Sequence, residues 1–332
     1  MNNKNRYFQF LRGILIICVV FIHTMYKNTN PSINYINIGL RCLVNFCVAI
    51  FVFISAYFVK KIGENPKEYI FSRFKRLIIP LLIWNLLYFI FEIVTETDII
   101  RSIKNFAIFN SAAQLYYVIV LFQLVVLTPL ILKYKRKKIV YIGLYSITPI
   151  YLIIIFILRI KYEVNIPLYQ YWFFGWLIYY LIGLDKRNKK IDEDRIKLKD
   201  IMYAIIFLLI SIFGNICIFI DNEKNYEYAT SQLNILNMFW TISLIPIILK
   251  INNKYKSNRI TRILEQIGDN SFGIYFIHIF VLNFLNYIWG SLEFNFFITY
   301  FIKCVMCVII SYLFIIGFKK ITKNKVNKYL GF

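Results

Sequence analysis

The sequence has no polar stretch long enough to form a soluble domain. Hydrophobic residues make up 59% of its 332 positions and aromatic residues 19%, whereas a soluble domain is about 45–50% apolar. This composition is typical of a polytopic membrane protein. Because no polar region remains beside the apolar segments, residues 1–332 are predicted to form a single transmembrane domain.

Motifs of several large enzyme classes are also missing. There is no Walker loop and no GxGxxG, so nothing indicates nucleotide hydrolysis, and neither GxSxG nor HExxH occurs. Histidine is nearly absent, because His23 and His278 are the only two, each in an apolar segment. Histidine, arginine and tyrosine inside a membrane are therefore the residues left to carry chemistry.

The six cysteines do not have the pattern of a disulfide framework, because all lie in apolar segments rather than in loops. Cys304 and Cys307 have CxxC spacing, but no further ligand-type residue lies beside them. We interpret them as small apolar packing residues and predict no metal site.

Acidic residues are scarce: 17 Asp and Glu stand against 39 Lys and Arg, which gives a net charge of +22. The basic residues cluster at every second connection between apolar runs, namely the N-terminus, residues 60–76, 133–138, 186–199 and 250–262, and the tail from 319. This is the positive-inside pattern of a membrane protein, not a nucleic-acid surface. It predicts cytoplasmic termini and an even number of spans.

Apolar runs of about 20 residues can cross a bilayer. The sequence therefore predicts an all-α transmembrane bundle of about ten spans, the sixth of them short. The spans lie near Phe8–Tyr26, Gly39–Val59, Leu77–Glu96, Ala113–Leu132, Ile139–Ile157, Gln170–Leu184, Ile201–Ile220, Leu233–Leu249, Ser271–Trp289 and Asn295–Phe318.

The first span carries two ionisable residues, Arg12 and His23. They are eleven residues apart, close to three helical turns, so both project from one helix face about 16 Å apart. An ionisable residue inside a span is a functional-site candidate by default. The charge pattern places Arg12 near the cytoplasmic end and His23 toward the outer face.

A polar stripe enters a late span, in GDNSFGIYFIHIFVL. Asn270 or Ser271 is suited to start the helix. Ser271, Tyr275 and His278 have helical spacing, so they lie on one face. The stripe serves either hydrogen bonding between helices or a function.

Two arginines, a tyrosine pair and one acid also allow two interpretations. Arg73 and Arg76, in RFKR before the third span, either fix topology at anionic lipid or bind phosphate groups as a pair. Tyr116 and Tyr117, at the outer end of the fourth span, have the positions of interface anchors. Glu92 lies within a span, where it could pair with a cation or orient a histidine.

Five segments follow one another along the chain: LRGILIICVVFIH, FVFISAYF, RFKR, QLYYVIVLFQL and NSFGIYFIH. Together they resemble the ordered motifs of the acyltransferase 3 family of integral membrane acyltransferases. The resemblance runs from Gln9 to His278. Two positions depart from the family pattern, because Gln9 replaces a frequent Asp or Glu and Tyr116 replaces a Trp.

The resemblance implies transfer of an acyl group, commonly acetyl, from cytoplasmic acyl-CoA to a hydroxyl of an extracytoplasmic sugar or cell-surface polysaccharide, which places the protein in the plasma membrane. The Lys-, Asn- and Ile-rich composition suggests an AT-rich bacterial genome. Arg73 and Arg76 would hold the CoA phosphates, and Arg12 would meet the donor inside the bundle. His23 would be the general base that takes the hydroxyl proton. The candidates for orienting the donor or stabilising the oxyanion are Asn270, Tyr117 and His278.

Two alternatives remain beside this reading. An exporter of a polysaccharide or small polar solute is also a helical bundle, although it needs no Arg-x-x-Arg pair beside an intramembrane histidine. Another kind of membrane acyltransferase uses a histidine late in the chain with an upstream Asn, but Arg12 and His23 in the first span argue against it. Binding of CoA would separate the enzyme from the exporter.

Overall fold

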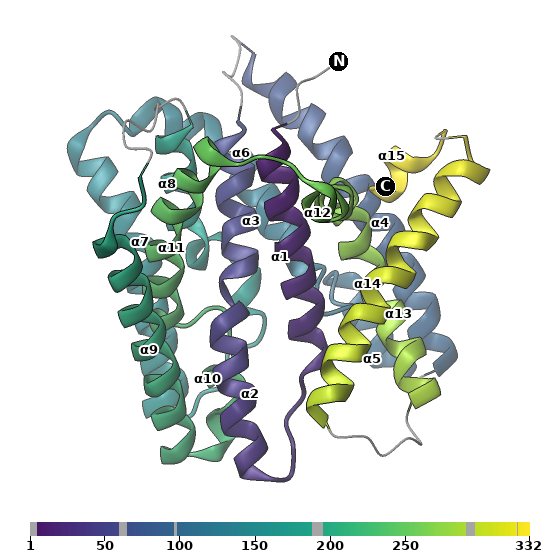
Figure 1. Cartoon of the computed structure of the whole chain (residues 1–332), viewed down its shortest axis with the longest axis horizontal. Helices are drawn as coiled ribbons and strands as arrows, with labels where there is room; N and C mark the ends of the chain where they lie inside the picture. Colours follow the sequence, from purple (N-terminus) through teal and green to yellow (C-terminus); the bar gives the residue numbers. More distant parts are fainter. Residues whose placement is uncertain (1–4, 60–64, 96–97, 188–194, 290–295, 324) are drawn as a thin grey trace. The chain divides into compact units, whose positions relative to one another are not determined.

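The computed structural model describes residues 5–59, 65–95, 98–187, 195–289, 296–323 and 325–332 (Figure 1). Every regular element in these residues is a helix, so the predicted all-α class is confirmed. Nine helical segments in this part of the chain are long and apolar enough to cross a membrane, and the protein is therefore multi-pass. They are Arg6–Thr24, Pro31–Tyr57, Pro66–Thr95, Tyr116–Tyr134, Lys138–Lys161, Leu198–Asp221, Ile235–Lys254, Ser271–Trp289 and Phe296–Ile321.

The sixth predicted span, Gln170–Leu184, is not one continuous helix. Single 3₁₀ turns at Tyr169–Tyr171 and Phe173–Gly175 are separated by an extended Trp172, and α8 (Leu177–Lys186) follows. A ten-residue helix is about 15 Å long, half the thickness of the hydrocarbon layer. The apolar run is thus divided between a turn-rich segment and a helix that is too short to cross on its own.

The second predicted span is formed by two helices. α2 (Pro31–Val44) and α3 (Phe46–Tyr57) meet at Asn45, whose side chain is buried. Asn45 Nδ2 donates to the backbone carbonyls of Thr230 (3.2 Å) and Ser231 (3.3 Å). The amide nitrogen at the junction is therefore paired with backbone that is distant in sequence.

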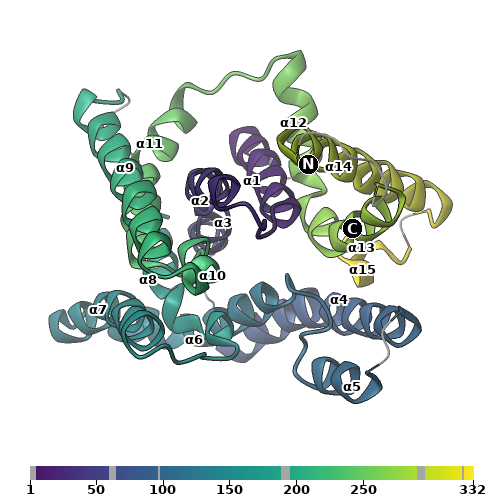
Figure 2. The same cartoon turned by 90° about the horizontal axis from the view of Figure 1, so that it is seen from below.

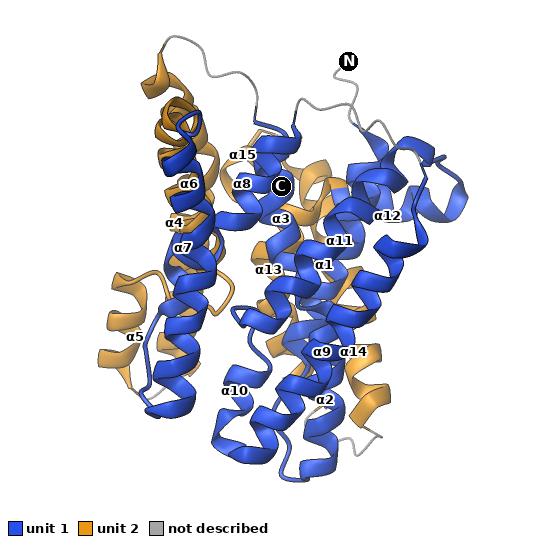
Figure 3. Cartoon of the chain, turned by 90° about the vertical axis from the view of Figure 1, so that its left-hand side faces the viewer, with its two compact units in different colours: residues 1–59, 135–268 blue, residues 60–134, 269–332 orange. Residues whose placement is uncertain are grey.

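The chain forms two compact units, of which unit 1 comprises Met1–Val59 and Lys135–Gly268 (Figure 3). In this unit α3 packs against α1 and α8, and α9 packs against α2 and α11 (Figure 1 and Figure 2). Its helices besides α2, α3 and α8 are α1 (Arg6–Thr24), α7 (Lys138–Phe156), α9 (Leu198–Asp221), α10 (Tyr226–Ala229), α11 (Ile235–Lys254) and most of α12 (Arg259–Asp269).

Unit 2 comprises Lys60–Tyr134 and Asp269–Phe332 (Figure 3). Here α4 packs against α5, α6 and α15, and α13 packs against α14. Trp84 of α4 donates from Nε1 to the carbonyl of Leu330 (3.0 Å), and its ring stacks on Phe276 at 5.9 Å. Its helices are α4 (Pro66–Thr95), α5 (Ile99–Ala107), α6 (Tyr116–Tyr134), α13 (Ser271–Trp289), α14 (Phe296–Ile321) and α15 (Asn327–Leu330).

Glycine allows α3 and α8 to approach closely within unit 1. A Cβ atom on Gly183 of α8 would lie 2.5 Å from the carbonyl oxygen of Phe53 and 2.7 Å from Cβ of Ala56. Small residues at helix contacts in membranes let the backbones approach closely. The resulting van der Waals packing stabilises the contact, because there is no hydrophobic driving force between helices in lipid. Gly183 therefore fixes how closely these two helices pack.

We expect Gly183→Ala to lower the Tm of the detergent-purified protein, because overpacking a close contact costs about 1–3 kcal/mol. Gly143→Ala in α7 is the matched control, since no heavy atom outside the local helix lies within 4 Å of a Cβ there. That change should leave Tm equal or raise it, as Ala exceeds Gly in helix propensity by about 1 kcal/mol. Equal shifts in the two variants would contradict the close-contact explanation.

Candidate functional site

The first-span pair lies on α1 of unit 1. Arg12 and His23 both belong to this unbroken helix, which begins after the cap residue Asn5 and ends at Thr24. Both side chains are partly buried. The carbon of the Arg12 guanidinium lies 5.9 Å from the centre of the Phe58 ring. The helix geometry on which the sequence prediction depends is therefore present.

The end of α1 that carries His23 is held by Arg41 of α2. Arg41 Nη1 donates to the carbonyl of Ile22 at 2.7 Å. Its Nε and Nη2 donate to the carbonyl of Thr230 at 3.1 and 2.9 Å. The guanidinium thus joins the backbone directly before His23 to the residue that ends α10, where helix carbonyls lack internal donors. Sequence reasoning placed Arg41 in a span but gave it no role.

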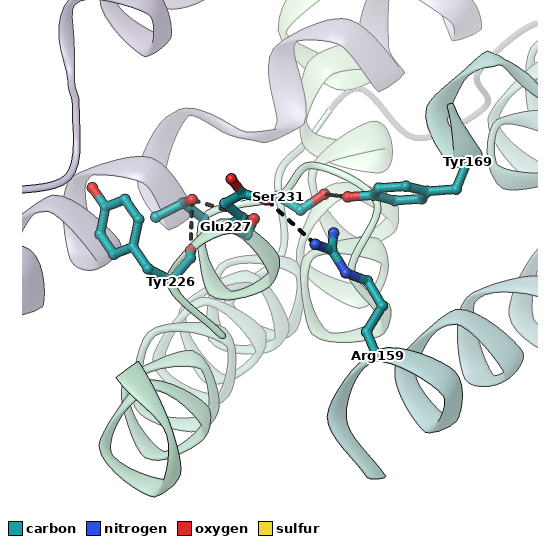
Figure 4. Close-up of polar contacts among 6 residues, drawn as sticks. Arg159, Tyr169, Tyr226, Glu227 and Ser231 are labelled. Carbon is teal, nitrogen blue, oxygen red and sulfur yellow. Dashed lines mark hydrogen bonds and ion pairs between the residues drawn. The ribbon is translucent and has the colours of Figure 1, made fainter. Parts of the chain in front are cut away.

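Polar side chains hold the segment that follows α10. Asn237 Nδ2 donates to the carbonyl of Ser231 at 2.7 Å, and Ser231 Oγ lies 2.8 Å from Tyr169 Oη (Figure 4). Asn234 Nδ2 donates to Oδ1 of Asn215 at 2.5 Å. The backbone carbonyls that accept from Arg41 and Asn45 therefore lie in a segment that several helices hold in place.

The Arg12 end of α1 is crossed closely by α12. A Cβ on Gly13 would overlap the carbonyl oxygen of Leu264, and a Cβ on Gly268 would overlap that of Gln9. Gln9, which departs from the family pattern, thus takes part in the crossing through its backbone. Gly268 opens the late sequence segment that contains the polar stripe.

His278 lies on α13 of unit 2 and is fully buried. Its Nδ1 lies 2.7 Å from the carbonyl of Tyr275 and 3.1 Å from that of Ile274. A carbonyl can only accept, so Nδ1 carries the proton and donates. In the neutral ring the lone pair is then on Nε2. Cys307 donates from Sγ to the carbonyl of His278 at 3.3 Å.

Tyr275 and Tyr117 meet beside this histidine. Tyr275 Oη donates to the carbonyl of Gln114, and its ring lies 5.6 Å from that of Tyr117 in an edge-to-face contact. The rings of Tyr275 and His278 are 6.3 Å apart. Tyr117 is only 8% exposed. It therefore packs between helices of unit 2, and it shares a cluster with His278 through Tyr275.

Asn270 lies directly before the first residue of α13. Its side-chain oxygen accepts from Lys319 Nζ at 2.5 Å, and its carbonyl accepts from the backbone of Ile274 at 3.0 Å. Eight residues of helix separate Asn270 from His278, about 12 Å along the axis. The structure therefore does not bring these two candidates to one point.

Arg73 and Arg76 lie in the first turns of α4. The guanidinium carbon of Arg73 is 5.8 Å from the centre of the Tyr69 ring, whereas Arg76 is exposed. An open hollow of about 640 Å³ is lined by neighbouring residues such as Lys67 and Phe71. At about 100° per residue, Arg76 lies roughly half a turn from those two, so the hollow is on the opposite helix face.

The remaining polar candidates have structural partners. Glu92 Oε1 accepts from Asn105 Nδ2 of α5 at 3.2 Å. Cys304 and Cys307 are buried, and neither forms a disulfide within the described residues. No group of three His, Cys, Asp or Glu side chains that could hold a metal ion occurs among the described residues.

These residues define a multi-pass helical membrane protein with arginine, histidine and tyrosine inside its spans; Arg12 and His23 belong to unit 1, and the other candidates belong to unit 2. The chain belongs to the acyltransferase 3 family, whose model, described as an acyltransferase domain, matches residues 5–316. It is thus a membrane acyltransferase. No curated protein and no solved structure matches the chain.

The tautomer of His278 is directly measurable. In protein labelled with ¹⁵N-histidine, we expect the His278 ring to be protonated at Nδ1, because two backbone carbonyls face that atom. The sequence has two histidines, so a His23→Gln variant isolates the His278 signal. A ring of His278 protonated at Nε2 alone would contradict the assigned hydrogen bonds.

Proposed function

We propose that the protein transfers an acyl group, acetyl in the simplest case, from cytoplasmic acyl-CoA to a hydroxyl of an extracytoplasmic sugar or cell-surface polysaccharide. The observation that carries the proposal is the pair on α1: an arginine and a histidine three turns apart in one membrane-length helix. Their separation of about 16 Å is about half the hydrocarbon layer, so one helix can reach a donor from one side and an acceptor from the other.

His23 acts as the general base in this reaction. Its ring takes the proton of the acceptor hydroxyl while that oxygen attacks the thioester carbonyl. The tetrahedral intermediate collapses with cleavage of the C–S bond, and the CoA thiolate leaves and takes up a proton. The products are an ester of the acceptor and free CoA. A neutral histidine suits this step because one ring nitrogen keeps a lone pair.

The arginines act on the donor. CoA carries its phosphates at one end and its thioester at the end of a flexible arm, so the two parts can be bound at different depths. Arg73 and Arg76, three residues apart on α4, hold the phosphates by charge-assisted hydrogen bonds. Arg12, on the cytoplasmic half of α1, meets the donor closer to the reacting carbon. His278, Tyr117 and Asn270 are the candidates for orienting the donor or stabilising the oxyanion.

Arg41 is a positioning residue for His23. Its hydrogen bond to the carbonyl of Ile22 fixes the turn from which His23 projects. A misplacement of about 1 Å at a reacting group can cost about 100-fold in rate. Arg41 therefore contributes to catalysis by holding the base in place.

One test of the proposed function concerns the base, His23, and its positioning residue, Arg41. His23→Gln should lower acetyl transfer by about 10²–10⁴-fold, the usual contribution of a general base. Arg41→Gln should lower kcat by about 10–100-fold and leave KM for acetyl-CoA unchanged, and Arg41→Lys should restore part of the rate. The measurement is transfer of radiolabelled acetyl from acetyl-CoA to an envelope glycan fraction in membrane vesicles.

Two controls accompany this measurement. Lys27→Gln removes an exposed cation just beyond α1 and should keep normal transfer. The Tm of each purified variant shows whether it is folded. A folded His23→Gln protein that acetylates at the normal rate would exclude the general-base role.

Another test of the proposed function concerns binding of the acyl donor. Arg76→Gln should raise KM for acetyl-CoA by about tenfold with little change in kcat, because it removes a charge-assisted phosphate contact. Lys75→Gln is the matched control, since the Lys75 ammonium lies over the Phe71 ring at 4.4 Å, away from the arginine face. CoA should raise the Tm of the wild-type protein and raise that of Arg76→Gln less. If CoA changes the Tm of the wild-type protein no more than unrelated nucleotides do, export of a polar solute is the better function.

A further inference from the structure

A separate pocket lies within unit 1, between α7 and the turn-rich segment that precedes α8. It is largely open to the outside, and its volume of about 340 Å³ is within the range of about 300–1,000 Å³ for ligand pockets. The lining is almost entirely carbon. The side chains that form it include Tyr151, Ile155, Leu158, Tyr169, Trp172 and Phe174.

Hydrogen bonds from α7 hold the wall of this pocket in place. Tyr151 Oη donates to the carbonyl of Tyr169 at 2.6 Å, and Thr148 Oγ1 donates to the carbonyl of Phe174 at 2.7 Å. The segment also contains Leu168 with a positive φ of 56°. A non-glycine residue in this conformation is uncommon. The pocket is therefore preformed and not a gap between loosely packed loops.

Arg159 places a positive charge at the edge of the pocket. It lies in a single π-helical turn, Ile157–Lys161, a feature that occurs frequently at functional sites. Its guanidinium carbon is 5.3 Å from the centre of the Tyr169 ring, which lines the pocket. Its Nη2 lies 3.3 Å from Glu227 Oε2 (Figure 4).

The ion pair of Arg159 with Glu227 is weak enough to be exchanged. The Arg159 side chain is 15% exposed, whereas that of Glu227 is 80% exposed. An ion pair with one partner in water is worth little, and its long contact joins one nitrogen to one oxygen. A phosphate can instead accept from two nitrogens of the same guanidinium. The site thus combines a hydrocarbon-lined pocket with a cation that can change partners.

We propose that this pocket binds a lipid with a phosphate headgroup, its hydrocarbon chain in the pocket and its phosphate on Arg159. A bare sugar is a poorer occupant, because the lining offers almost no hydrogen-bonding groups. The positive-inside pattern assigns Arg159 to the outer side, so the lipid comes from the outer leaflet. This inference goes beyond acyl transfer and does not depend on it.

The test is native mass spectrometry of the full chain, purified in detergent and titrated with phosphatidylglycerol. Diacylglycerol with the same chains lacks the phosphate, and glycerol 3-phosphate lacks the chains. We expect phosphatidylglycerol to bind at least tenfold more tightly than either. If diacylglycerol binds as tightly as phosphatidylglycerol, the pocket holds only non-specific annular lipid. If glycerol 3-phosphate binds as tightly, the ligand is a soluble phosphate compound. Either result would overturn the proposal.

Two variants with opposite expected effects locate the site. Arg159→Gln should weaken phosphatidylglycerol binding about tenfold. Glu227→Gln should strengthen it two- to fivefold, because the guanidinium loses its competing carboxylate. Lys161→Gln is the control. It removes an exposed ammonium group from the same turn, whose Nζ lies 5.5 Å from the centre of the Tyr162 ring. This variant should change binding less than twofold. If Glu227→Gln weakens binding, or if Lys161→Gln has the effect expected of Arg159→Gln, the proposed site is wrong.

Discussion

The hydrogen bonds of Arg41 are the contact on which the polar part of unit 1 depends. An ion taken out of water costs several kcal/mol unless its hydrogen bonds are replaced. Arg41 directs its donors at the carbonyls of Ile22 and Thr230, both at helix ends where no internal donor is available. One charged side chain therefore satisfies two helix ends that hydrocarbon would leave unsatisfied, and the two ends in turn satisfy the charge.

The same requirement explains why the sixth apolar run is not a full-length helix. Residues of α7 donate to the carbonyls of Tyr169 and Phe174, so backbone outside a regular helix has partners there. Irregular backbone at membrane depth is tolerated only where the protein supplies such partners. Hydropathy reports the length of an apolar run but not the donors that a distant helix brings to it. For this reason nine of the described segments could be predicted as spans, whereas the division of Gln170–Leu184 could not.

The candidate site shows the same division between local and distant information. Arg12 and His23 could be placed on one face because both belong to one helix, whose geometry is fixed by residue spacing. The contact of Tyr275 with Gln114 and Tyr117 joins segments far apart in sequence, and no spacing rule reports it. The sequence does indicate that Arg41 has hydrogen-bonding partners, because an arginine inside a span needs them. Its partners are two backbone carbonyls, which every residue offers, and the sequence therefore could not name them.

The two histidines differ in what their surroundings allow. His278 has no exposed area, and its Nδ1 donates to carbonyls of its own helix. His23 is partly exposed and belongs to the last turn of α1. A general base must reach the proton of a molecule that enters and leaves, which requires access as well as a lone pair. This difference in exposure supports the proposed role of His23 as the base, and His278 stays a candidate for orienting the donor or stabilising the oxyanion.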